Sequence, residues 1–282
     1  METSPNKITI VKASGEVVLF SLTKLKKSLK RTGADDALVS EILKIVQDEL
    51  YEGITTKEIY NRAFALLKKK KNVFASKYKL KKAIYELGPT GFPFEHFVAA
   101  ILKYSGYKVK IGEVLQGECV QHEVDVLAHK NNETTVVECK FHSEQGLVCN
   151  VKIPLYIHSR YQDVKNHWNT FNKHKTTLTQ GWVVTNTRFT DDAEKYGNCA
   201  GLYLLSWDYP KENSLKDIID RLGLYPITVS TLLTKREKQF LLNRDVVLCR
   251  ELIKDSFYLD HLGVSDARKS RILSEIQQLC SV

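Results

Sequence analysis

The sequence lacks the features of secreted, membrane-spanning and zinc-binding proteins. Its six cysteines are scattered over 282 residues without any Cys-x-x-Cys pair, which excludes a zinc ribbon and a dense disulfide framework. No apolar run approaches the roughly 18 residues that a membrane helix needs. Residues 1–7 lack the apolar stretch of a signal peptide. These absences predict a protein of the reducing cytosol without a membrane partner.

The sequence also lacks internal repeats, and its only low-complexity segments are clusters of lysine. Hydrophobic residues make up 43% and charged residues 27% of the chain, which is ordinary for a globular protein and argues against a mainly disordered one. Because a domain has roughly 100–200 residues, the length allows two domains.

Positive charge is concentrated in the first third of the chain. The net charge is +9, and residues 1–85 contain 18 Lys/Arg against 9 Asp/Glu, whereas residues 86–282 contain 24 of each. Much of the surplus lies in residues 68–71 and 77–82. Such a patch suits the phosphates of a nucleotide or a nucleic acid. A solvated helix end followed by a basic linker is the alternative interpretation.

Hydrophobic periodicity predicts a multi-domain α+β protein. The first region combines a β-hairpin, with its turn at Ser14-Gly15, and three helices. Gly88-Pro89 and Gly91 break any helix after a basic linker. Strands and helices then alternate, which predicts an α/β sheet with a parallel strand-helix-strand unit. A helical region ends the chain. The predicted regions are 1–70, 71–87, 88–211 and 212–282.

Individual elements follow from the same patterns, with N-caps predicted at Thr55-Thr56, Thr190, Thr234 and Ser265 and a helix end at Gly197. Thr234 and Glu237 have the spacing of a capping box. The predicted hairpin covers 7–21. The predicted helices of the first two domains are 23–32, 37–50, 56–67, one from Pro93 onward, 155–175 and 190–196. The predicted strands of the sheet are 107–114, 119–129, 134–141, 181–185 and 202–207.

The segment from Glu123 to Lys140 contains two acids and a lysine in a predicted hairpin. Asn131-Asn132 lies between two alternating runs and suits a two-residue turn, because Asn tolerates positive φ. With that turn Asp125 faces Glu138, and Glu123 faces Lys140. Since side chains alternate along a strand, the two acids and Lys140 are expected on the solvent side. The opposite side, toward the core, is expected to carry Val124, Val126, Val137 and Cys139.

This arrangement of charges suits metal-dependent chemistry. Two directly opposed carboxylates repel each other, and a divalent cation such as Mg²⁺, which prefers carboxylate oxygens, would remove that repulsion. The ammonium group of Lys140 is suited to stabilising negative charge or orienting a water molecule. A solvated hairpin face, with Lys140 paired to Glu123, is the alternative interpretation.

Asp125 followed by Glu138-Cys139-Lys140 resembles the signature of PD-(D/E)xK nucleases. Further segments narrow the resemblance, over about 88–210, to the Mrr-like restriction endonucleases. These segments are Gly91-Phe-Pro-Phe-Glu95-His-Phe, Tyr104-Ser-Gly106-Tyr and Thr185-Asn-Thr-Arg-Phe-Thr-Asp-Asp-Ala193. One departure is Glu123-Val-Asp125, where the family often has glycine in place of the glutamate.

The resemblance implies hydrolysis of DNA phosphodiester bonds with Mg²⁺ or Mn²⁺. Asp125 and Glu138 would be metal ligands, with the Cys139 carbonyl as a further ligand. Lys140 would activate or position the attacking water. Glu95 would complete the metal shell, or it is an ordinary carboxylate on a helix flank.

Cations and aromatic residues follow the strand that carries Lys140. They suit contacts to DNA phosphates, but they equally suit an ordinary amphipathic helix, and a structural role is favoured for each one. The residues concerned are His142, Lys152, Tyr156, His158 and Arg160.

The first region resembles an ATP-cone over about 7–68. The motifs that carry the resemblance are Ile10-Val-Lys12-Ala-Ser-Gly15-Glu with Phe20 and Lys24, and Gly53-Ile-Thr-Thr56-Lys-Glu-Ile59-Tyr60. It implies that ATP or dATP binds as a regulatory ligand without hydrolysis and changes the oligomeric state. No P-loop motif is present.

The resemblance to ATP-cones also implies ligand contacts. Lys12 and Lys24 would meet the phosphates, and Thr56 would lie near the base or ribose. Ala13 replaces the family's usual arginine, and Tyr60 replaces its common histidine near the base. A cone that only mediates assembly is the alternative.

Together these motifs predict a homo-oligomeric, metal-dependent DNA endonuclease that an adenine nucleotide regulates, and the family implies a role in restriction or defence. A DNA repair or junction-resolving nuclease with the same chemistry is an alternative. A non-catalytic, nucleotide-responsive DNA-binding protein is another, against which the complete set Asp125, Glu138 and Lys140 argues.

Overall fold

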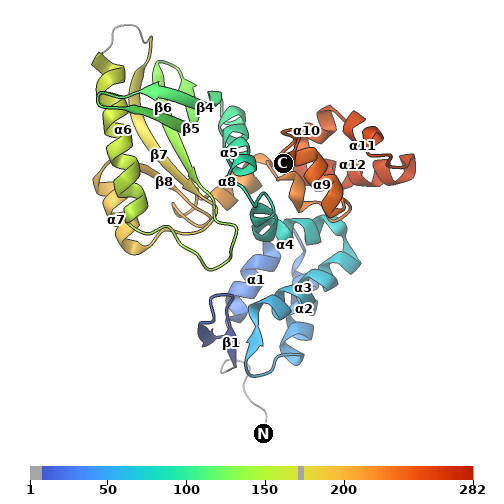
Figure 1. Cartoon of the computed structure of the whole chain (residues 1–282). Helices are drawn as coiled ribbons and strands as arrows, with labels where there is room; N and C mark the ends of the chain where they lie inside the picture. Colours follow the sequence, from blue (N-terminus) through green and yellow to red (C-terminus); the bar gives the residue numbers. More distant parts are fainter. Residues whose placement is uncertain (1–7, 171–174, 282) are drawn as a thin grey trace.

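The computed structural model describes residues 8–170 and 175–281, so the start of the predicted hairpin and residues 171–174 of predicted helix 155–175 lie outside the described residues. The N-terminal elements lie below a five-stranded sheet in Figure 1, and the C-terminal helices lie beside that sheet. Within the described residues, no helix has both the length and the apolar character needed to cross a membrane.

The first region has the predicted hairpin and three helices. Strands β1 and β2 pair antiparallel around Gly15, whose φ is +82°, and a short third strand, β3, pairs parallel with β1. Thr55 caps α3 through a capping box with Glu58, as its position predicted. The elements are β1 (Thr9–Val11), β2 (Val17–Leu19), α1 (Leu22–Lys30), α2 (Asp36–Asp48), β3 (Ile54–Thr55) and α3 (Thr56–Lys70).

The stretch predicted as a basic linker, 71–87, consists mostly of helix α4 (Asn72–Tyr85). Ala75 packs into the core of the first region, whereas Leu80 and Ile84 pack into the core shared by the rest of the chain. The helix therefore joins two cores. Its lysines hid this amphipathic pattern, because four of them fall within the short stretch 77–82 of the helix.

The central region is built on a mixed five-stranded sheet in the order β4-β5-β6-β7-β8. The pairs β4-β5 and β5-β6 are antiparallel, and β6-β7 and β7-β8 are parallel, so the predicted parallel unit is present. The strands are β4 (Lys108–Gln116), β5 (Gln121–Lys130), β6 (Glu133–Lys140), β7 (Thr177–Thr185) and β8 (Tyr203–Leu205).

Helices cover both faces of this sheet. Helices α6 (Lys152–Thr170) and α7 (Asp191–Cys199) lie on one face, and α5 (Phe92–Tyr104) lies on the other (Figure 1). The predicted end of α7 at Gly197 is wrong, because the helix continues to Cys199. A Cβ atom at Gly197 would lie 2.6 Å from a Leu204 methyl group, so this glycine allows α7 to approach β8 closely.

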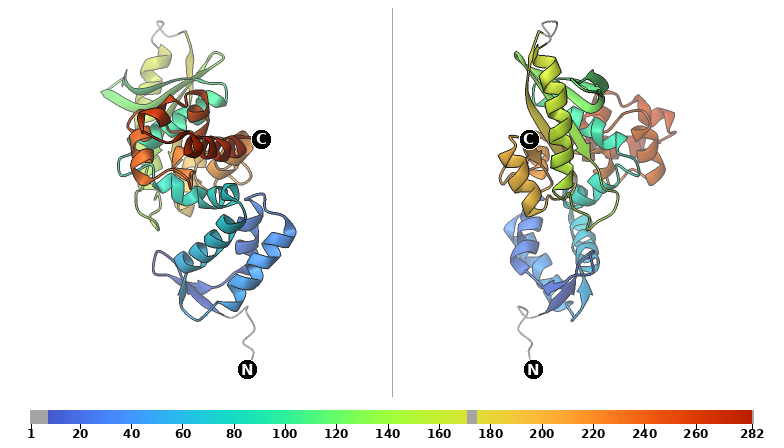
Figure 2. Two further views of the ribbon diagram at one scale, coloured as in Figure 1. Left: turned by 90° about the vertical axis from the view of Figure 1, so that its right-hand side faces the viewer. Right: turned by 60° about the vertical axis from the view of Figure 1, so that its left-hand side comes forward.

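The C-terminal region is helical, as predicted. Thr234 and Glu237 form a capping box, and Ser265 is the N-cap of α12. One continuous hydrophobic cluster joins these helices to α4, α5 and the α5 face of the sheet, and Figure 2 shows them beside α5 from two further sides. The elements are α8 (Leu215–Leu222), the 3₁₀ helix η2 (Ile227–Val229), α9 (Lys235–Leu242), α10 (Cys249–Lys254), α11 (Phe257–His261) and α12 (Asp266–Cys280).

Candidate active site

The hairpin β5-β6 has the predicted turn and register. Asn131 has a φ of +56°, and the ladder runs from Lys130 opposite Glu133 to Val126 opposite Val137. The next positions in this register are Asp125 and Glu138. The ladder ends there, because the Asp125 carboxylate Oδ2 accepts a hydrogen bond of 2.6 Å from the Cys139 backbone N–H.

The two acids do not lie on a solvent face, so that expectation is wrong. Leu127 lies two residues after Asp125 on β5, and Val136 lies two residues before Glu138 on β6. Both pack beneath α6 in a buried cluster. Glu138 is only 12% exposed in its side chain. The alternation on β5 is also interrupted, because Val124 packs in the α6-side cluster whereas Val126 packs on the α5 side.

Arg160 of α6 holds the Glu138 carboxylate. Its Nη1 lies 2.8 Å from Glu138 Oε1, and its other terminal nitrogen donates to the Glu123 carbonyl. The guanidinium also lies 5.4 Å from the centre of the exposed Tyr156 ring. The sequence placed Arg160 only among several cations with a favoured structural role. The sequence predicted the helix that carries Arg160, but only the folded chain shows that this helix covers the acids.

Three carboxyl groups interact electrostatically in this site. Burial, together with the negative charge of Asp125, raises the pKa of Glu138 to about 7. Burial and the charges of Asp125 and Glu123 raise the pKa of Glu95, at the start of α5, to about 7. Burial also raises the pKa of Asp125, although the Cys139 N–H and nearby Arg160 oppose the shift. The three acids therefore carry a shared excess of negative charge when all are ionised.

Lys140 is exposed at the end of β6, and within the described residues no ion pair joins it to Glu123. Burial and the positive charge of Lys140 lower the pKa of His142, and Lys140 also opposes the rise that burial causes in the pKa of Asp125. The Lys140 carbonyl accepts a hydrogen bond of 2.7 Å from Thr185 Oγ1 on β7. Lys140 is thus anchored through its backbone, and among the residues that the structure describes no carboxylate pairs with its exposed amine.

The loop after β6 is clamped by Asn186, a buried residue that the sequence indicated only as part of a motif. The Asn186 side chain accepts from the His142 N–H and donates to the His142 carbonyl, both at 2.8 Å. These bonds fix the direction in which the chain leaves Lys140. Among the other cations and aromatics, His158 bonds Tyr196 and supports packing of α6 on α7, and Lys152 is exposed at the start of α6.

The donor set of this site fits a hard divalent cation chemically, because carboxylate oxygens predominate and their mutual repulsion would be relieved. Asp125, Glu138 and Glu95 would hold the ion. In the part of the chain described, no group of three or more His, Cys, Asp or Glu side chains is already arranged around one point as a metal site would be. The Glu138 carboxylate is instead paired with Arg160.

A cavity of about 470 Å³ in the first region brings together Lys12, Thr56 and Tyr60, and we refer to it as the cone cavity. Lys12 pairs with Glu16 at 2.9 Å. The Tyr60 ring stacks on Tyr78 with centroids 5.2 Å apart, and burial raises the pKa of its hydroxyl. A stacked, neutral aromatic ring beside a lysine offers contacts for a base and for phosphates.

Lys24 does not line this cavity. It lines a neighbouring cavity of about 580 Å³ between α1, α4 and the end of the sheet, together with Lys27 and Arg31. Lys82 of α4 and Gln145 of the loop after β6 line the cone cavity instead. The sequence could not indicate Gln145, because it lies outside the first region.

These features are those of a nuclease-like α/β domain that follows an N-terminal domain of a nucleotide-binding type. Comparison with known proteins identifies both domains. Residues 8–85 match the ATP cone domain family, residues 89–208 the Mrr-type restriction endonuclease family, and residues 225–280 the family described as AF1548-like, C-terminal.

An uncharacterized protein of Archaeoglobus fulgidus is 30% identical over 183 residues, which are 64% of this chain and 99% of the relative. The crystal structure of a protein of unknown function, AF1548, is similar with a TM-score of 0.55 and 30% identity, and covers 68% of this chain and 98% of that one. The chain belongs to this AF1548-like family and joins an ATP-cone to an Mrr-like restriction endonuclease domain.

Proposed function

We propose that this protein is a divalent-metal-dependent DNA endonuclease whose activity an adenine nucleotide regulates, with a role in restriction or defence. The observation that supports this proposal most directly is the group of Asp125, Glu138 and Glu95 beside Lys140. Burial and mutual repulsion raise the pKa of Glu138 and that of Glu95 to about 7. Perturbed acids of this kind are characteristic of functional sites. The endonuclease family match supports hydrolysis as the chemistry.

In this proposal Asp125 and Glu138 bind Mg²⁺ or Mn²⁺, with the Cys139 carbonyl and Glu95 as further ligands. A bound cation supplies charge stabilisation at the scissile phosphate and lowers the pKa of a water ligand. The Lys140 amine orients the attacking water and stabilises the developing negative charge. Arg160 holds Glu138 through its ion pair before the ion binds.

Regulation is proposed to pass through the loop that follows β6. Its residue Gln145 lines the cone cavity with Lys12 and Tyr60. A Cβ atom on Gly146 would lie 3.6 Å from Ser14 in the cone hairpin. The loop therefore touches the proposed nucleotide site within six residues of Lys140. If ATP or dATP moved this loop, the position of the Lys140 amine relative to Asp125 and Glu138 would change.

The proposed division of labour assigns regulation to residues 1–70 and chemistry to residues 88–211. The helix within 71–87 and the helical region 212–282 share the core of the nuclease domain. A change of oligomeric state with nucleotide is part of the proposal, because cones commonly act by assembly.

The test is cleavage of methylated, unmethylated and branched DNA by the full chain with Mg²⁺, with and without ATP or dATP. Asp125→Asn and Glu138→Gln are each expected to abolish cleavage while the protein remains folded. Glu113→Gln is the matched control, because Glu113 is a carboxylate of the same sheet that pairs with Lys110 outside the site. Full activity of either site variant contradicts the assignment. Cleavage confined to branched DNA would favour junction resolution over restriction.

A further inference from the structure

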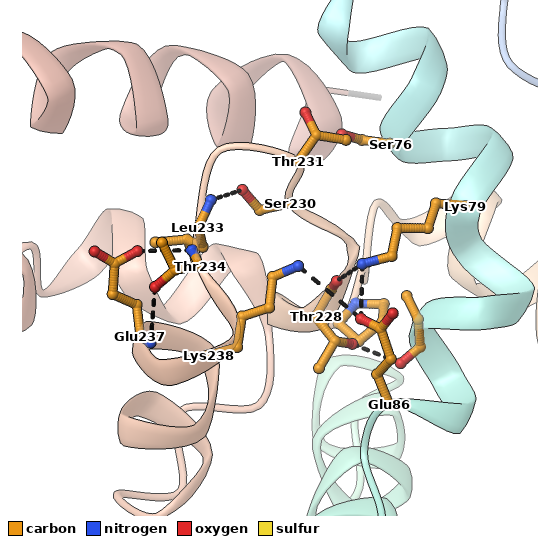
Figure 3. Close-up of polar contacts among 12 residues, drawn as sticks. Ser76, Lys79, Glu86, Thr228, Ser230, Thr231, Leu233, Thr234, Glu237 and Lys238 are labelled. Atoms are coloured by element: carbon orange, nitrogen blue, oxygen red, sulfur yellow. Dashed lines mark hydrogen bonds and ion pairs between the residues drawn. The ribbon is translucent and has the colours of Figure 1, made fainter. Parts of the chain in front are cut away.

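A cavity of about 760 Å³ lies between α4, α9 and the loop after β6, and its lining includes neither the acids of the candidate active site nor any residue of the cone cavity. Its lining includes Lys79 of α4, Glu86 after that helix, Ser143 of the loop, and Lys235 and Lys238 of α9. Figure 3 shows Lys79, Glu86 and Lys238 converging between α4 and the C-terminal helices. The residues of α9 that line the cavity belong to the AF1548-like C-terminal region.

Lys79 is fixed in place by acceptors of the protein. Its Nζ lies 2.7 Å from Glu86 Oε2 and donates to the Thr228 carbonyl at 2.9 Å. The Thr228 hydroxyl in turn donates to the Ala83 carbonyl at 2.6 Å, which ties η2 to α4. Glu86 is therefore already engaged by one lysine.

Lys238 is a buried cation with little compensation. The residue is only 9% exposed, and its Nζ lies 4.0 Å from the same Glu86 oxygen that Lys79 binds. Within the described residues its ammonium group donates no hydrogen bond to a protein acceptor. The ammonium group lines the cavity without a close acceptor in the part of the protein that the structure describes, which suits it to bind an anion.

The nearby carboxylate of Glu275 is not available for Lys238. Its oxygens accept hydrogen bonds from Ser76 at 2.6 Å, from Ser230 at 2.5 Å, and from the Thr231 hydroxyl at 2.7 Å. This buried acid thus ties α12 to α4 and to the segment after η2. Two ammonium groups share one carboxylate in the cavity, which leaves a positive charge for a ligand.

We propose that this cavity binds a phosphate group, which accepts hydrogen bonds from Lys238 and is surrounded by Lys235, Ser143 and Gln239. A phosphate supplies several acceptor oxygens and the negative charge that the lysine pair lacks. Nucleotides and the DNA backbone both carry this group. A bound phosphate would also touch the loop after β6 at Ser143, three residues beyond Lys140.

The titration of Lys238 provides a specific signature. Burial and the positive charge of Lys79 lower the pKa of Lys238 to about 7, against the attraction of Glu86 and Glu275. The exposed Lys235 adds a further positive charge on α9. An anion favours the protonated form, so binding above pH 7 should take up a proton. The affinity should consequently fall as the pH rises above 7.

The experiment is calorimetric titration of the full chain with sulfate, which does not itself titrate in this range, and with inorganic phosphate. Repeating it in buffers of different ionisation enthalpy counts the protons taken up. At pH 8 the wild type is expected to take up close to one proton per sulfate, and its affinity should fall about tenfold or more between pH 7 and 9. Lys238→Met should bind at least tenfold more weakly and take up none.

Arg236→Gln is the matched control, because Arg236 is an exposed cation on the same helix and does not line the cavity. It should bind sulfate like the wild type. Lys235→Ala, at an exposed position, should weaken binding severalfold without affecting folding. Equal sulfate affinity in the wild type, Lys238→Met and Lys235→Ala would overturn the proposal. A lower melting temperature of Lys238→Met without any anion effect in the wild type would overturn it too, in favour of a structural ion pair.

The source of the phosphate follows from competition with sulfate. In a Lys12→Ala variant the cone cavity is impaired, so ATP that still displaces sulfate must act at the Lys238 cavity. That result identifies a nucleotide as the source of the phosphate. Displacement by a short DNA duplex, and not by ATP, indicates the DNA backbone. Failure of both to compete while sulfate still binds at Lys238 overturns the biological part of the proposal. None of these readouts requires cleavage, so the result is independent of the proposed nuclease activity.

Discussion

Glu138 and Arg160 form an ion pair of 2.8 Å between β6 and α6, and the side chain of each is less than a fifth exposed. The pair joins the acid of the nuclease signature to a helix that is distant from it in sequence. Arg160 lowers the pKa of Glu138, although burial and Asp125 outweigh it. The arginine therefore controls how much of Glu138 is ionised near neutral pH.

Removing Arg160 should shift the pH profile of cleavage. Arg160→Met is expected to raise the pKa of Glu138 above its value of about 7, so cleavage should require a higher pH. Arg160→Lys keeps the charge and should shift the profile less. The measurement is cleavage against pH at Mg²⁺ concentrations below saturation, because a saturating ion would itself hold Glu138 ionised. An unchanged profile in Arg160→Met, with the same fold, would show that Glu138 is not the titrating group.

Glu138 should destabilise the metal-free protein as pH rises. Its pKa is about 7 in the folded chain against an ordinary value of 4.5, so the folded state holds the proton more tightly than the unfolded state. This stabilisation is present below pH 4.5 and is lost as pH rises to 7. In chelator, Glu138→Gln should remove this loss and be more stable than wild type at pH 8 by about 1–3 kcal/mol. Urea unfolding of both proteins at pH 5 and pH 8 measures the difference, and a less stable Glu138→Gln at pH 8 would contradict it.

Lys140 should act on the reaction and not on metal binding. Lys140→Ala is expected to leave Mg²⁺ affinity largely intact and to slow cleavage by roughly 10²–10³-fold, because the amine acts on developing charge or on the water. Lys108→Ala, which removes an exposed lysine from β4, is the control. A changed Mg²⁺ affinity with unchanged turnover would exclude the proposed role.

Lys12 and the basic residues 68–71 should have separable effects. Lys12→Ala is expected to abolish the response to ATP or dATP and to spare basal DNA affinity, because Lys12 lines the cone cavity. Neutralising residues 68–71 should weaken DNA binding and reduce its dependence on salt. Nucleotide binding and DNA binding at several salt concentrations test both statements. A wild type that binds neither nucleotide at millimolar concentration would contradict nucleotide regulation, with Ala13 and Tyr60 as the residues to examine.

Gln145 should couple the cone to the nuclease domain. Gln145→Ala removes a side chain that reaches the cone cavity from the loop after β6. It should reduce the nucleotide effect on cleavage while leaving cleavage without nucleotide unchanged. Since allosteric coupling is typically ~1–3 kcal/mol, the full effect lies at about 5–150-fold. The ratio of rates with and without dATP measures it. Glu144→Ala serves as the neighbouring control, and an undiminished ratio in Gln145→Ala would exclude this route.

Local patterns in the sequence were sufficient for much of the fold. The turn at Asn131 determined the register of β5-β6, since a two-residue loop permits one pairing only. The threonines at 55–56 and the capping-box spacing at Thr234 marked helix starts, because such side chains satisfy backbone N–H groups within the first turn. The helix α4 was missed, since its lysines concealed a buried face that becomes meaningful only against two cores.

The sequence by itself was enough to single out Asp125, Glu138 and Lys140 as candidate site residues, because the turn at Asn131 sets Asp125 opposite Glu138 and Lys140 follows two positions along the same strand. Only the tertiary structure decided their environment. Helix α6 buries the acids and brings Arg160 to Glu138, and α5 brings Glu95 near them. It also decided that Gln145 reaches the cone and that Lys238 meets Lys79 across α9 and α4. Burial and charge at such places depend on packing between distant segments, which no local pattern records.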